Sequence, residues 1–459
     1  MNILAIHTSH DGSMTYVKEN KVVFHTQLDR LNRLKNMPMP SRRAFRIIEK
    51  IDFDVIIFTG LKESNCLDMW MQYMNQNKII QSKMTKAEIL IRFDEHHLYH
   101  CYASLAWNKD ISNILVMDMG GVYKTNKFGD RTAEQESIYS YGHHIKTTSL
   151  NIGNKFGQGS KDIYKRFFQE GKLLAYSLHD QRARALQVLF ESEFDLYIKN
   201  NDLKDDLILT GGCAQNVINN SKQIKNFNTL WPDPFNGDFG ISLGAINYHL
   251  SNRLKIDNVF LGVKQKLNFN LFKDCELRDT SPQEVASILI NEPVAIFQSR
   301  SEQGQRGLGN RSLLMNANHM VAMEKVNAIK EREWYRPFAC TIIQTEAAAW
   351  FDMTVKESPY MMFTFKVLED KKHYFKTGLA KDDTCRLQTL KFDDNPHFYN
   401  LLEAFEDRSE LPFLLNTSLN LPGEVLVEDM TDLRHMLDNS DLKYVYFPEE
   451  MVLLIKPSV

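Results

Sequence analysis

The sequence predicts an α/β protein of two domains, and three observations lead to that prediction. The chain has 459 residues, which is long for a single domain. Over its first half, short runs rich in β-branched residues alternate with longer segments of helical periodicity. This pattern weakens over residues 251–281 and then starts again. We therefore expect one domain over residues 1–268 and a second over residues 269–459.

Six strands and three helices are expected in the first domain. The strands are apolar runs bounded by turn residues, and they cover residues 2–7, 13–18, 21–27, 54–60, 114–119 and 206–210. The helices show apolar residues at helical spacing, and they cover residues 95–107, 179–199 and 238–250. Alternation of this kind indicates helices packed on a central sheet.

The second domain is expected to begin with a helix over residues 282–291, followed by a strand over residues 294–298. Later strands are expected near residues 360–367 and 413–415. The second domain is thus also predicted to be α/β.

The composition excludes several classes of protein. Hydrophobic residues make up 43% and charged residues 25%, which excludes a disordered or fibrous chain. The net charge of −3 argues against non-specific nucleic-acid binding through a globally basic surface. No apolar run approaches the roughly 18 residues of a membrane span, and the start of the chain does not read as a secretion signal. The six scattered cysteines indicate a reduced protein, so we expect a cytoplasmic location without a membrane partner.

Three strands of the first domain end in turns of small and polar residues. These turns cover residues 10–13, 118–121 and 210–216. Glycine lets the backbone approach a phosphate closely, and a following helix N-terminus favours the negative charge. One such turn often binds nothing, but three in one domain predict a nucleotide at the carboxyl ends of the strands.

A pair of histidines at the start of a predicted helix is a candidate metal site. His96 and His100 are four residues apart, which places both rings on one helix face. Asp118 and Asp238, which lie in turns, are the best candidates for further ligands. Two imidazoles and two carboxylates suit Fe(II), Mn(II) or Zn(II) better than copper. The alternative is a partly exposed histidine cluster without a metal.

Residues 298–337 are rich in basic side chains interleaved with glycine. Guanidinium groups and exposed backbone N–H groups together can bind phosphate through bidentate hydrogen bonds. The basic residues are Arg300, Arg306, Arg311, Lys330, Arg332 and Arg336. They predict an anion site, although arginines on a solvated loop are an alternative. Farther on, Asn416, Ser418 and Asn420 could fix a planar polar ligand, or they could form only a turn.

Together these motifs resemble the O-carbamoyltransferases of the NodU/TobZ/CmcH type. The most specific pair is RSEQGQRGLGNRS at residues 300–312 and NAIKEREWYRPFA at residues 327–339. The other matching stretches, in chain order, are SHDGS, EHHLYHCYASLAW, MDMGG, TGGCAQNVINN, NGDFGISLGA, SPYMM, TCRLQTL, NPHFYNLLEAF and LLNTSLNLPGE. The resemblance covers nearly the whole chain, from residue 10 to residue 424.

The resemblance implies a fold and an activity. It implies an actin/Hsp70-like (ASKHA) ATPase domain, related to the proteins of threonylcarbamoyl-adenosine synthesis, followed by a YrdC-like domain. The YrdC-like domain is expected to join carbamoyl phosphate to ATP, giving carbamoyl adenylate with release of pyrophosphate and phosphate. The first domain is then expected to pass the carbamoyl group to a hydroxyl and release AMP. Implied cofactors are ATP with Mg²⁺ and a divalent metal, reported as iron(II) in the family.

The resemblance also implies roles for single residues. The implied metal ligands are His96, His100, Asp118 and Asp238, and His10 is the implied general base. The implied nucleotide-binding residues of the first domain are Gly120, Gly211, Gly212, Gln215 and Asn216. The residues implied for the carbamoyl-phosphate and ATP site are Arg300, Glu302, Gly304, Arg306, Arg311, Ser312, Lys330, Arg332, Arg336, Asn416, Ser418 and Asn420, with Arg306 and Arg336 expected to be catalytic.

The identity of the acceptor stays open. The chain is short for the family around residues 125–205, where larger members shape the acceptor pocket. A small molecule, a sugar, or a hydroxymethylated nucleotide or DNA base is compatible with the sequence, and so is a homodimer. The alternatives are a threonylcarbamoyl-adenosine-type enzyme acting on tRNA, which would predict a basic surface, and a sugar-kinase or Hsp70-like regulator, which would lack the arginine-rich domain.

Overall fold

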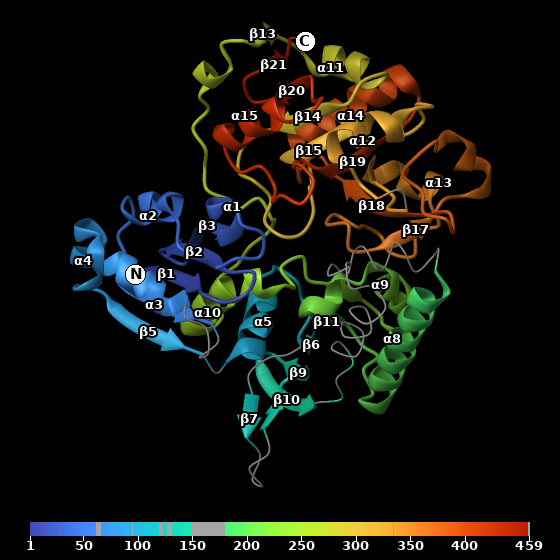
Figure 1. The fold of residues 1–459 in the computed structure, drawn as a ribbon. Helices are drawn as coiled ribbons and strands as arrows, with labels where there is room; N and C mark the ends of the chain where they lie inside the picture. The colour runs from blue at the N-terminus through green and yellow to red at the C-terminus, as the bar shows by residue number, and fades with distance from the viewer. Residues whose placement is uncertain are drawn as a thin grey trace. The chain divides into compact units, whose positions relative to one another are not determined.

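A computed structural model describes residues 1–60, 66–93, 95–118, 123–125, 131–148, 150, 152, 180–333 and 335–457 (Figure 1). The chain forms two compact units, and the main division along the sequence falls between Leu261 and Gly262. The boundary predicted at residue 268 lies just before η4 (Phe269–Phe272), a short 3₁₀ helix of the second unit. Among the described residues, no helix combines the length and apolar character needed to cross a membrane.

The first sheet of unit 1 has five strands in the order β3-β2-β1-β4-β5. Their bounds are β1 (Asn2–His7), β2 (Ser13–Lys18), β3 (Lys21–Gln27), β4 (Val55–Thr59) and β5 (Glu88–Arg92). The first three strands pair antiparallel, whereas β4 is parallel to β1 and β5 is parallel to β4. Strands β1 and β4 are almost wholly buried, so this sheet carries much of the core.

The second sheet of unit 1 repeats this plan with the order β10-β9-β6-β11-β12. Its strands are β6 (Asn113–Met117), β9 (Glu136–Ser140), β10 (His143–Thr148), β11 (Leu207–Thr210) and β12 (Leu230–Pro232). Here too three strands, β10, β9 and β6, pair antiparallel, whereas β11 is parallel to β6 and β12 is parallel to β11. Two sheets with one strand order and one set of directions form the duplicated core of the actin/Hsp70-like ATPase fold. The fold class expected for the first domain is confirmed.

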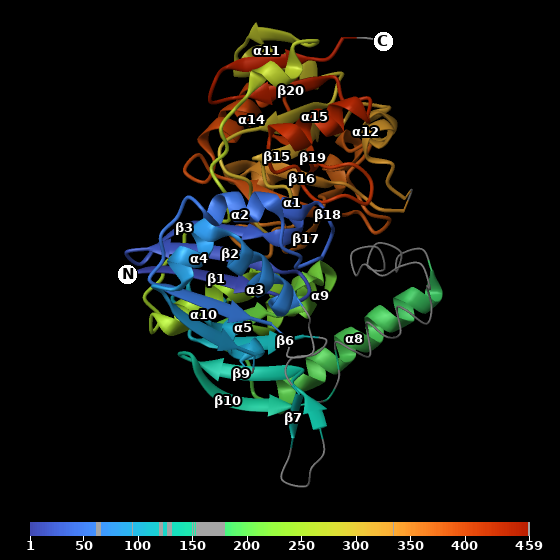
Figure 2. The same cartoon turned by 60° about the vertical axis from the view of Figure 1, so that its left-hand side comes forward.

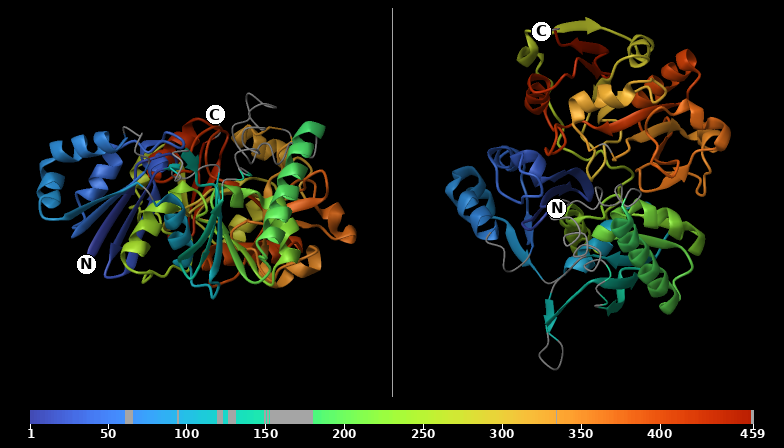
Figure 3. Two further views of the ribbon diagram at one scale, coloured as in Figure 1. Left: turned by 90° about the horizontal axis from the view of Figure 1, so that it is seen from below. Right: turned by 45° about the vertical axis from the view of Figure 1, so that its right-hand side comes forward.

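Two helices lie between these sheets. Helix α5 (His96–Leu105) packs on β6 and β11, and α10 (Ile241–His249) packs on β1, β2 and β4, as Figures 1 and 2 show. The two helices approach very closely, because a Cβ at Gly244 would lie 1.9 Å from the Tyr99 carbonyl oxygen. The view from below in Figure 3 shows the same pair between the strands of the two sheets.

The remaining described elements of unit 1 are mostly short. They are α1 (Leu28–Asn32), α2 (Arg42–Ile48), α3 (Cys66–Gln76), α4 (Lys78–Met84), α8 (Gln181–Asn200), α9 (Val217–Gln223) and the pair β7 (Tyr123–Thr125) and β8 (Arg131–Ala133). The six predicted strands and three predicted helices are present with shifts of a few residues at their described ends. The helix predicted from residue 238 starts with a 3₁₀ turn, η3 (Asp238–Gly240), before α10.

Unit 2 is built on a nine-stranded mixed sheet in the order β13-β21-β20-β14-β15-β19-β16-β18-β17. The strands are β13 (Glu276–Asp279), β14 (Val294–Phe297), β15 (Arg311–Met315), β16 (Ala339–Ile343), β17 (Thr364–Lys366), β18 (Thr384–Leu390), β19 (Phe413–Ser418), β20 (Tyr444–Phe447) and β21 (Val452–Ile455). The helices are α11 (Pro282–Leu289), α12 (Ala322–Lys330), α13 (Ala347–Trp350), α14 (Pro396–Ser409) and α15 (Met430–Asp438). The predicted helix at residue 282 begins with a capping box between Ser281 and Glu284. The second domain is therefore α/β, as expected.

Candidate functional site

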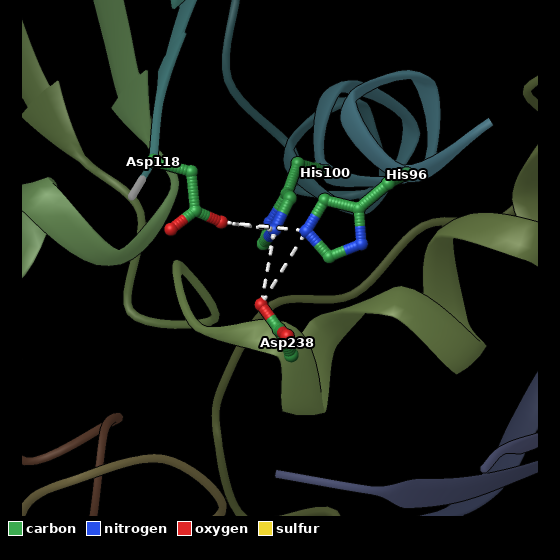
Figure 4. Close-up of side chains that lie close together, drawn as sticks. All are labelled: His96, His100, Asp118 and Asp238. Carbon is green, nitrogen blue, oxygen red and sulfur yellow. Dashed lines mark hydrogen bonds and ion pairs between the residues drawn. The ribbon is translucent and has the colours of Figure 1, made fainter. Parts of the chain in front are cut away.

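Four side chains predicted as metal ligands meet in unit 1 (Figure 4). His96 and His100 project from the first turns of α5. Asp118 follows β6 directly, and Asp238 opens η3. One ligand atom from each of the four side chains lies within 4.8 Å of those of the other three. The structure thus brings together residues that are up to 142 positions apart in the sequence.

Each histidine nitrogen of this cluster lies close to one oxygen of both carboxylates. His96 Nε2 lies 3.4 Å from Asp118 Oδ2 and 3.6 Å from Asp238 Oδ1. His100 Nε2 lies 3.3 Å and 3.5 Å from the same two oxygens. Each imidazole therefore faces both carboxylates, which is the arrangement that a single ion between the four groups requires.

Burial and charge at the cluster fit a divalent cation. The His100 side chain is fully buried, and its Nδ1 atom has no hydrogen-bond partner among the described residues. Burial disfavours the charged imidazole, but the facing Asp118 and Asp238 outweigh it and raise the pKa of His100 to about 9. Although burial opposes ionisation of the two carboxyls, the histidines hold the pKa of both Asp118 and Asp238 below the usual range. Two imidazoles and two carboxylates suit manganese, iron or zinc, and this donor set does not single out iron.

A buried carboxylate that is not part of the cluster, that of Asp233, holds the position of α5, the helix that carries His96 and His100. Asp233 accepts hydrogen bonds from Ser104 Oγ at 2.6 Å and from Trp107 Nε1 at 2.8 Å. Ser104 lies one turn beyond His100 on α5 and also donates to the His100 carbonyl. Because Asp233 is fully buried, these contacts hold α5 and its two histidines at a fixed place.

The glycine turn after β11 lies against the metal cluster. Gly211 has φ +84°, and a Cβ there would lie 2.3 Å from the Met117 carbonyl oxygen, so only glycine fits. A Cβ at Gly212 would lie 3.1 Å from Asp118 Oδ1, and a Cβ at Gly237 would lie 3.4 Å from the Gln215 amide nitrogen. The turn predicted to hold a nucleotide is therefore adjacent to two of the four candidate ligands.

Two other residues predicted to bind the nucleotide have different outcomes. Asn216 caps α9, since its side chain accepts from Asn219 N at 3.0 Å and donates to Gln187 Oε1 at 3.1 Å. This side chain is thus used in holding the turn in shape. Gly120 lies outside the described residues.

Two histidines of the first strand and its turn lie near the cluster. The side chain of His10 is 66% exposed, and its hydrogen bond with Asp11 raises the pKa of His10 to about 9. His7 is 1% exposed, and its ring centre lies 6.5 Å from that of His96. Burial lowers the pKa of His7 to about 3. Sequence analysis missed His7, and the available signal was an ionisable residue ending an otherwise apolar strand.

Three arginines form a candidate anion site in unit 2. The guanidinium groups of Arg332, Arg336 and Arg386 interact electrostatically with one another. Burial first, and then repulsion from Arg336 and Arg386, hold the pKa of Arg332 well below its usual range. Burial and Arg336 lower the pKa of Arg386 to about 10. A bound anion would relieve this repulsion.

The described residues supply little compensating negative charge at this cluster. Glu333 forms an ion pair with Arg336 at 3.2 Å. The buried Arg332 Nη1 and Arg386 Nε atoms have no hydrogen-bond partner among the described residues. Arg386 lies on β18, and sequence analysis did not single it out because it lies outside the glycine-rich stretch.

Arg311 and Glu302 hold the glycine-rich loop in shape, and the binding role predicted for them stays a prediction. The Arg311 guanidinium is fully buried and donates to the carbonyl oxygens of Gln298, Ser299, Asn310 and Glu428. Glu302 Oε1 accepts from the backbone N–H groups of Leu308, Asn310 and Arg311. Both charged groups are thus engaged by the backbone, because a buried loop needs partners for its polar groups.

Several other predicted residues are engaged within unit 2. Ser312 accepts from Gly309 N at 2.9 Å, and Lys330 Nζ donates to the carbonyls of Ser418 and Asn420 at 2.6 and 2.7 Å. Ser418 Oγ donates to Asn420 Oδ1 at 2.6 Å, so both belong to this same lysine-centred contact.

Four further predicted residues lie in the glycine-rich loop or beside it in the sheet. Arg300 and Arg306 are partly buried in the loop between β14 and β15, where Gly304 has φ +111°. Asn416 donates to Thr341 Oγ1 at 2.9 Å, and its own Oδ1 atom has no partner among the described residues.

The fold and these sites define a two-domain protein in which one domain carries a candidate metal site beside a glycine turn and the other carries a cluster of arginines. A model of the carbamoyltransferase C-terminus matches residues 285–453. An uncharacterised protein of Methanocaldococcus jannaschii is 25% identical, over 99% of this chain and 100% of its own length. The nodulation protein NolNO of Sinorhizobium fredii is 24% identical, over 92% of this chain and 76% of its own length. The 3'-hydroxymethylcephem-O-carbamoyltransferase of Streptomyces clavuligerus is 30% identical, over 50% of this chain and 44% of its own length.

These matches confirm the family that the motifs predicted: the chain is a carbamoyltransferase of the NodU and NolO type. Among solved structures, an activator of 2-hydroxyisocaproyl-CoA dehydratase from Clostridium difficile with bound ADPNP matches 55% of this chain and 96% of its own, with 11% identity and a TM-score of 0.33. A ROK hexokinase from Thermus thermophilus matches 55% and 99%, with 10% identity and a TM-score of 0.33. The fold assignment rests on the strand order of the two sheets in unit 1.

Proposed function

We propose that this carbamoyltransferase is ATP-dependent, forms carbamoyl adenylate in unit 2, and transfers the carbamoyl group to a hydroxyl in unit 1. The observation that carries the proposal is the presence of two chemically different sites in separate units. One is the cluster of Arg332, Arg336 and Arg386, and the other is the His/Asp cluster beside the glycine turn. The first suits phosphates, and the second suits a Lewis acid beside a nucleotide.

In the first step, water cleaves carbamoyl phosphate to carbamate and phosphate. A carbamate oxygen then attacks the α-phosphorus of ATP, forming carbamoyl adenylate while pyrophosphate leaves. Both reactions bring several negative charges together, and the three guanidinium groups would offset that repulsion. Burial of Arg332 and Arg386 strengthens this effect, because charges interact more strongly where water is excluded.

In the second step, the acceptor hydroxyl attacks the carbamoyl carbon, and AMP leaves with the electrons of the broken bond. A metal ion held by His96, His100, Asp118 and Asp238 would supply Lewis-acid stabilisation of the developing charge. The hydroxyl proton needs a base, and His10 is the proposed one. Because Asp11 raises the pKa of His10 to about 9, the neutral fraction of His10 increases with pH through the neutral range.

The two steps need different cofactors, and the second step also needs an acceptor. ATP with Mg²⁺ serves the first step, and the metal of unit 1 is a divalent transition ion, with Fe(II) as the resemblance implies and Mn(II) or Zn(II) as alternatives. The acceptor carries a hydroxyl group, because the cephem relative is named as an O-carbamoyltransferase. Small molecules, sugars and hydroxymethylated nucleotides or DNA bases are the candidate acceptors.

The proposal is tested by measuring the two steps separately in the full chain. Wild-type protein given carbamoyl phosphate, ATP and Mg²⁺ should release pyrophosphate, and a screen of hydroxyl compounds by mass should reveal one gaining a carbamoyl group. Arg386→Ala should lose pyrophosphate release by at least tenfold, because one missing charge at a phosphate site costs several kcal/mol. His100→Ala should keep that release but should no longer transfer the carbamoyl group to the acceptor hydroxyl.

Matched variants control for general damage. Arg408→Ala removes an exposed arginine near the end of α14, and His249→Ala removes a half-buried histidine at the end of α10 that is outside both clusters, so neither should change either step. Equal loss of pyrophosphate release in Arg386→Ala and His100→Ala would refute two separate sites. Production of ADP in place of pyrophosphate and AMP would refute the adenylate.

A further inference from the structure

His7 is a buried polar residue to which the proposed reaction assigns no role. It ends β1, is 1% exposed, and its Nδ1 atom lies 3.0 Å from Thr59 Oγ1 on the neighbouring strand β4. Its other ring nitrogen, Nε2, is buried and has no hydrogen-bond partner among the described residues. A buried donor or acceptor without a partner is destabilising, so a ligand for this atom is expected.

The His7 ring, which carries this Nε2 atom, lies near the metal cluster. The ring centre lies 6.5 Å from that of His96, and His7 interacts electrostatically with Asp238, His96 and His100. His7 therefore lies beside the histidines of the cluster. His7 is not one of the four residues whose ligand atoms converge.

The tautomer of His7 depends on its contact with Thr59. The Thr59 side chain is buried, and His7 Nδ1 is the partner of its hydroxyl among the described residues. A threonine hydroxyl can donate or accept, and we take the tautomer in which Thr59 donates to Nδ1. The neutral ring then carries its own proton on Nε2, which makes that atom a hydrogen-bond donor.

We propose that His7 is a ligand-binding residue of the metal site, and that its Nε2–H donates a hydrogen bond to a phosphate oxygen bound at the ion. A donor of this kind suits an oxyanion, and hydrogen bonds to charged acceptors are the stronger ones. The glycine turn after β11 lies beside Asp118, since a Cβ at Gly212 would lie 3.1 Å from Asp118 Oδ1, and glycine-rich turns of this kind suit a phosphate. The inference rests on the metal site of the proposed function.

A second histidine of the same sheet provides a matched control. His25 on β3 is fully buried, its Nδ1 lies 2.8 Å from Thr15 Oγ1, and its Nε2 also lacks a partner among the described residues. Its ring lies 5.0 Å from that of Phe235, and it is absent from the groups around the metal cluster. The two histidines thus match in burial and in their threonine contact. They differ in their neighbours, because His7 lies near His96 and His25 lies near Phe235.

The test uses the full chain loaded with Co²⁺, whose visible absorption reports its ligands, and inorganic phosphate as the probe. His7→Phe keeps a ring of similar size and should weaken phosphate binding at Co²⁺ about tenfold or more, while the Kd for Co²⁺ stays within about threefold. His7→Gln keeps an N–H group at a similar reach and should recover most of the phosphate affinity. His25→Phe should bind phosphate as the wild type does.

Three results would overturn the role of His7. They are wild-type phosphate affinity in His7→Phe, an equal loss in His25→Phe, or no response of the wild-type Co²⁺ spectrum to phosphate. If His7→Phe does not fold, wild-type-like phosphate binding by His7→Gln together with loss of binding in Thr59→Val supports the proposal, and the reverse overturns it. Failure of the wild type to bind Co²⁺ would instead refute the metal site itself, so the two failures are distinguishable.

Discussion

At the scale of single residues, binding of an ion to the candidate metal ligands should be coupled to the release of a proton. In the absence of an ion, the facing carboxylates raise the pKa of His100 to about 9, so His100 carries its proton at pH 7. A metal ligand must be the neutral imidazole. Binding of a divalent ion at pH 7 therefore has to displace this proton.

We expect about one proton to be released per Zn²⁺ bound at pH 7, and we expect affinity to rise up to tenfold per pH unit until about pH 9. Calorimetric titrations in two buffers of different ionisation enthalpy would count the protons. The control variant His249→Ala, at a residue outside the cluster, should behave as the wild type. Zn²⁺ affinity that is flat between pH 7 and pH 9 would contradict the raised pKa.

Residue types and spacing predicted part of the site from the sequence alone. The i, i+4 pair of His96 and His100 indicated a shared face, and Asp118 and Asp238 were found because they end a strand and open a helix. His7 and Arg386 were missed, since each stands alone in an apolar strand and gains its partners only through sheet pairing.

Charge alone does not tell a ligand-binding arginine from one that holds a loop. Arg311 lies in the same glycine-rich stretch as Arg306, yet Arg311 donates to four carbonyls of its own unit. The sequence could not show this, because the carbonyls that it binds come from three separate stretches of the chain. The hydrogen bonds separate the two roles: Arg311 donates to four carbonyls, whereas Arg332 Nη1 and Arg386 Nε have no hydrogen-bond partner among the described residues.

At the scale of elements, the close packing of α5 on α10 links the fold to the site. Helix α5 carries His96 and His100, and α10 follows directly from the turn that holds Asp238. The backbones come so close at Gly244 that a side chain there would overlap the Tyr99 carbonyl. The distance between these two helices therefore sets the distance between the ligands that they carry.

Gly244→Ala should destabilise the protein by about 1–3 kcal/mol and weaken Zn²⁺ binding, because the added methyl forces the two helices apart. Urea unfolding and Zn²⁺ titration would measure the two effects. His249→Ala, at the last residue of α10, is the control for a change on the same helix. A stable Gly244→Ala variant with wild-type Zn²⁺ affinity would show that α5 and α10 do not set the ligand spacing.

Three of the strands that sequence analysis did not predict, β5, β10 and β12, have a physical reason for being missed. Strand β5 is exposed along most of its length and has no alternation of buried and exposed residues, and β10 is similarly exposed. These strands sit at the edges of their sheets, so they form through backbone pairing with one neighbour more than through side-chain burial. Strand β12 has only three residues, which is too short for a periodic pattern.

At the scale of the whole molecule, two units each provide one half of the proposed reaction. The duplicated strand order of unit 1 could not be predicted from composition or periodicity, because the halves differ in the lengths of their connections and helices. All four candidate metal ligands lie in unit 1, and the three clustered arginines lie in unit 2. Each ligand should therefore stabilise its own unit.

We expect calorimetric unfolding of the full chain to resolve this division. A ligand that binds only the folded state stabilises it by RT ln(1 + [L]/Kd), which is about 2.7 kcal/mol at a hundredfold excess over Kd. Zn²⁺ should raise the melting temperature of one transition, and pyrophosphate, as a probe of the arginine cluster, should raise that of another. His100→Ala should abolish only the Zn²⁺ shift, and Arg386→Ala should abolish only the pyrophosphate shift. Arg408→Ala should keep both shifts. If either variant abolished both shifts, the metal ion and the phosphate would share one site, and the assignment of one step to each unit would be wrong.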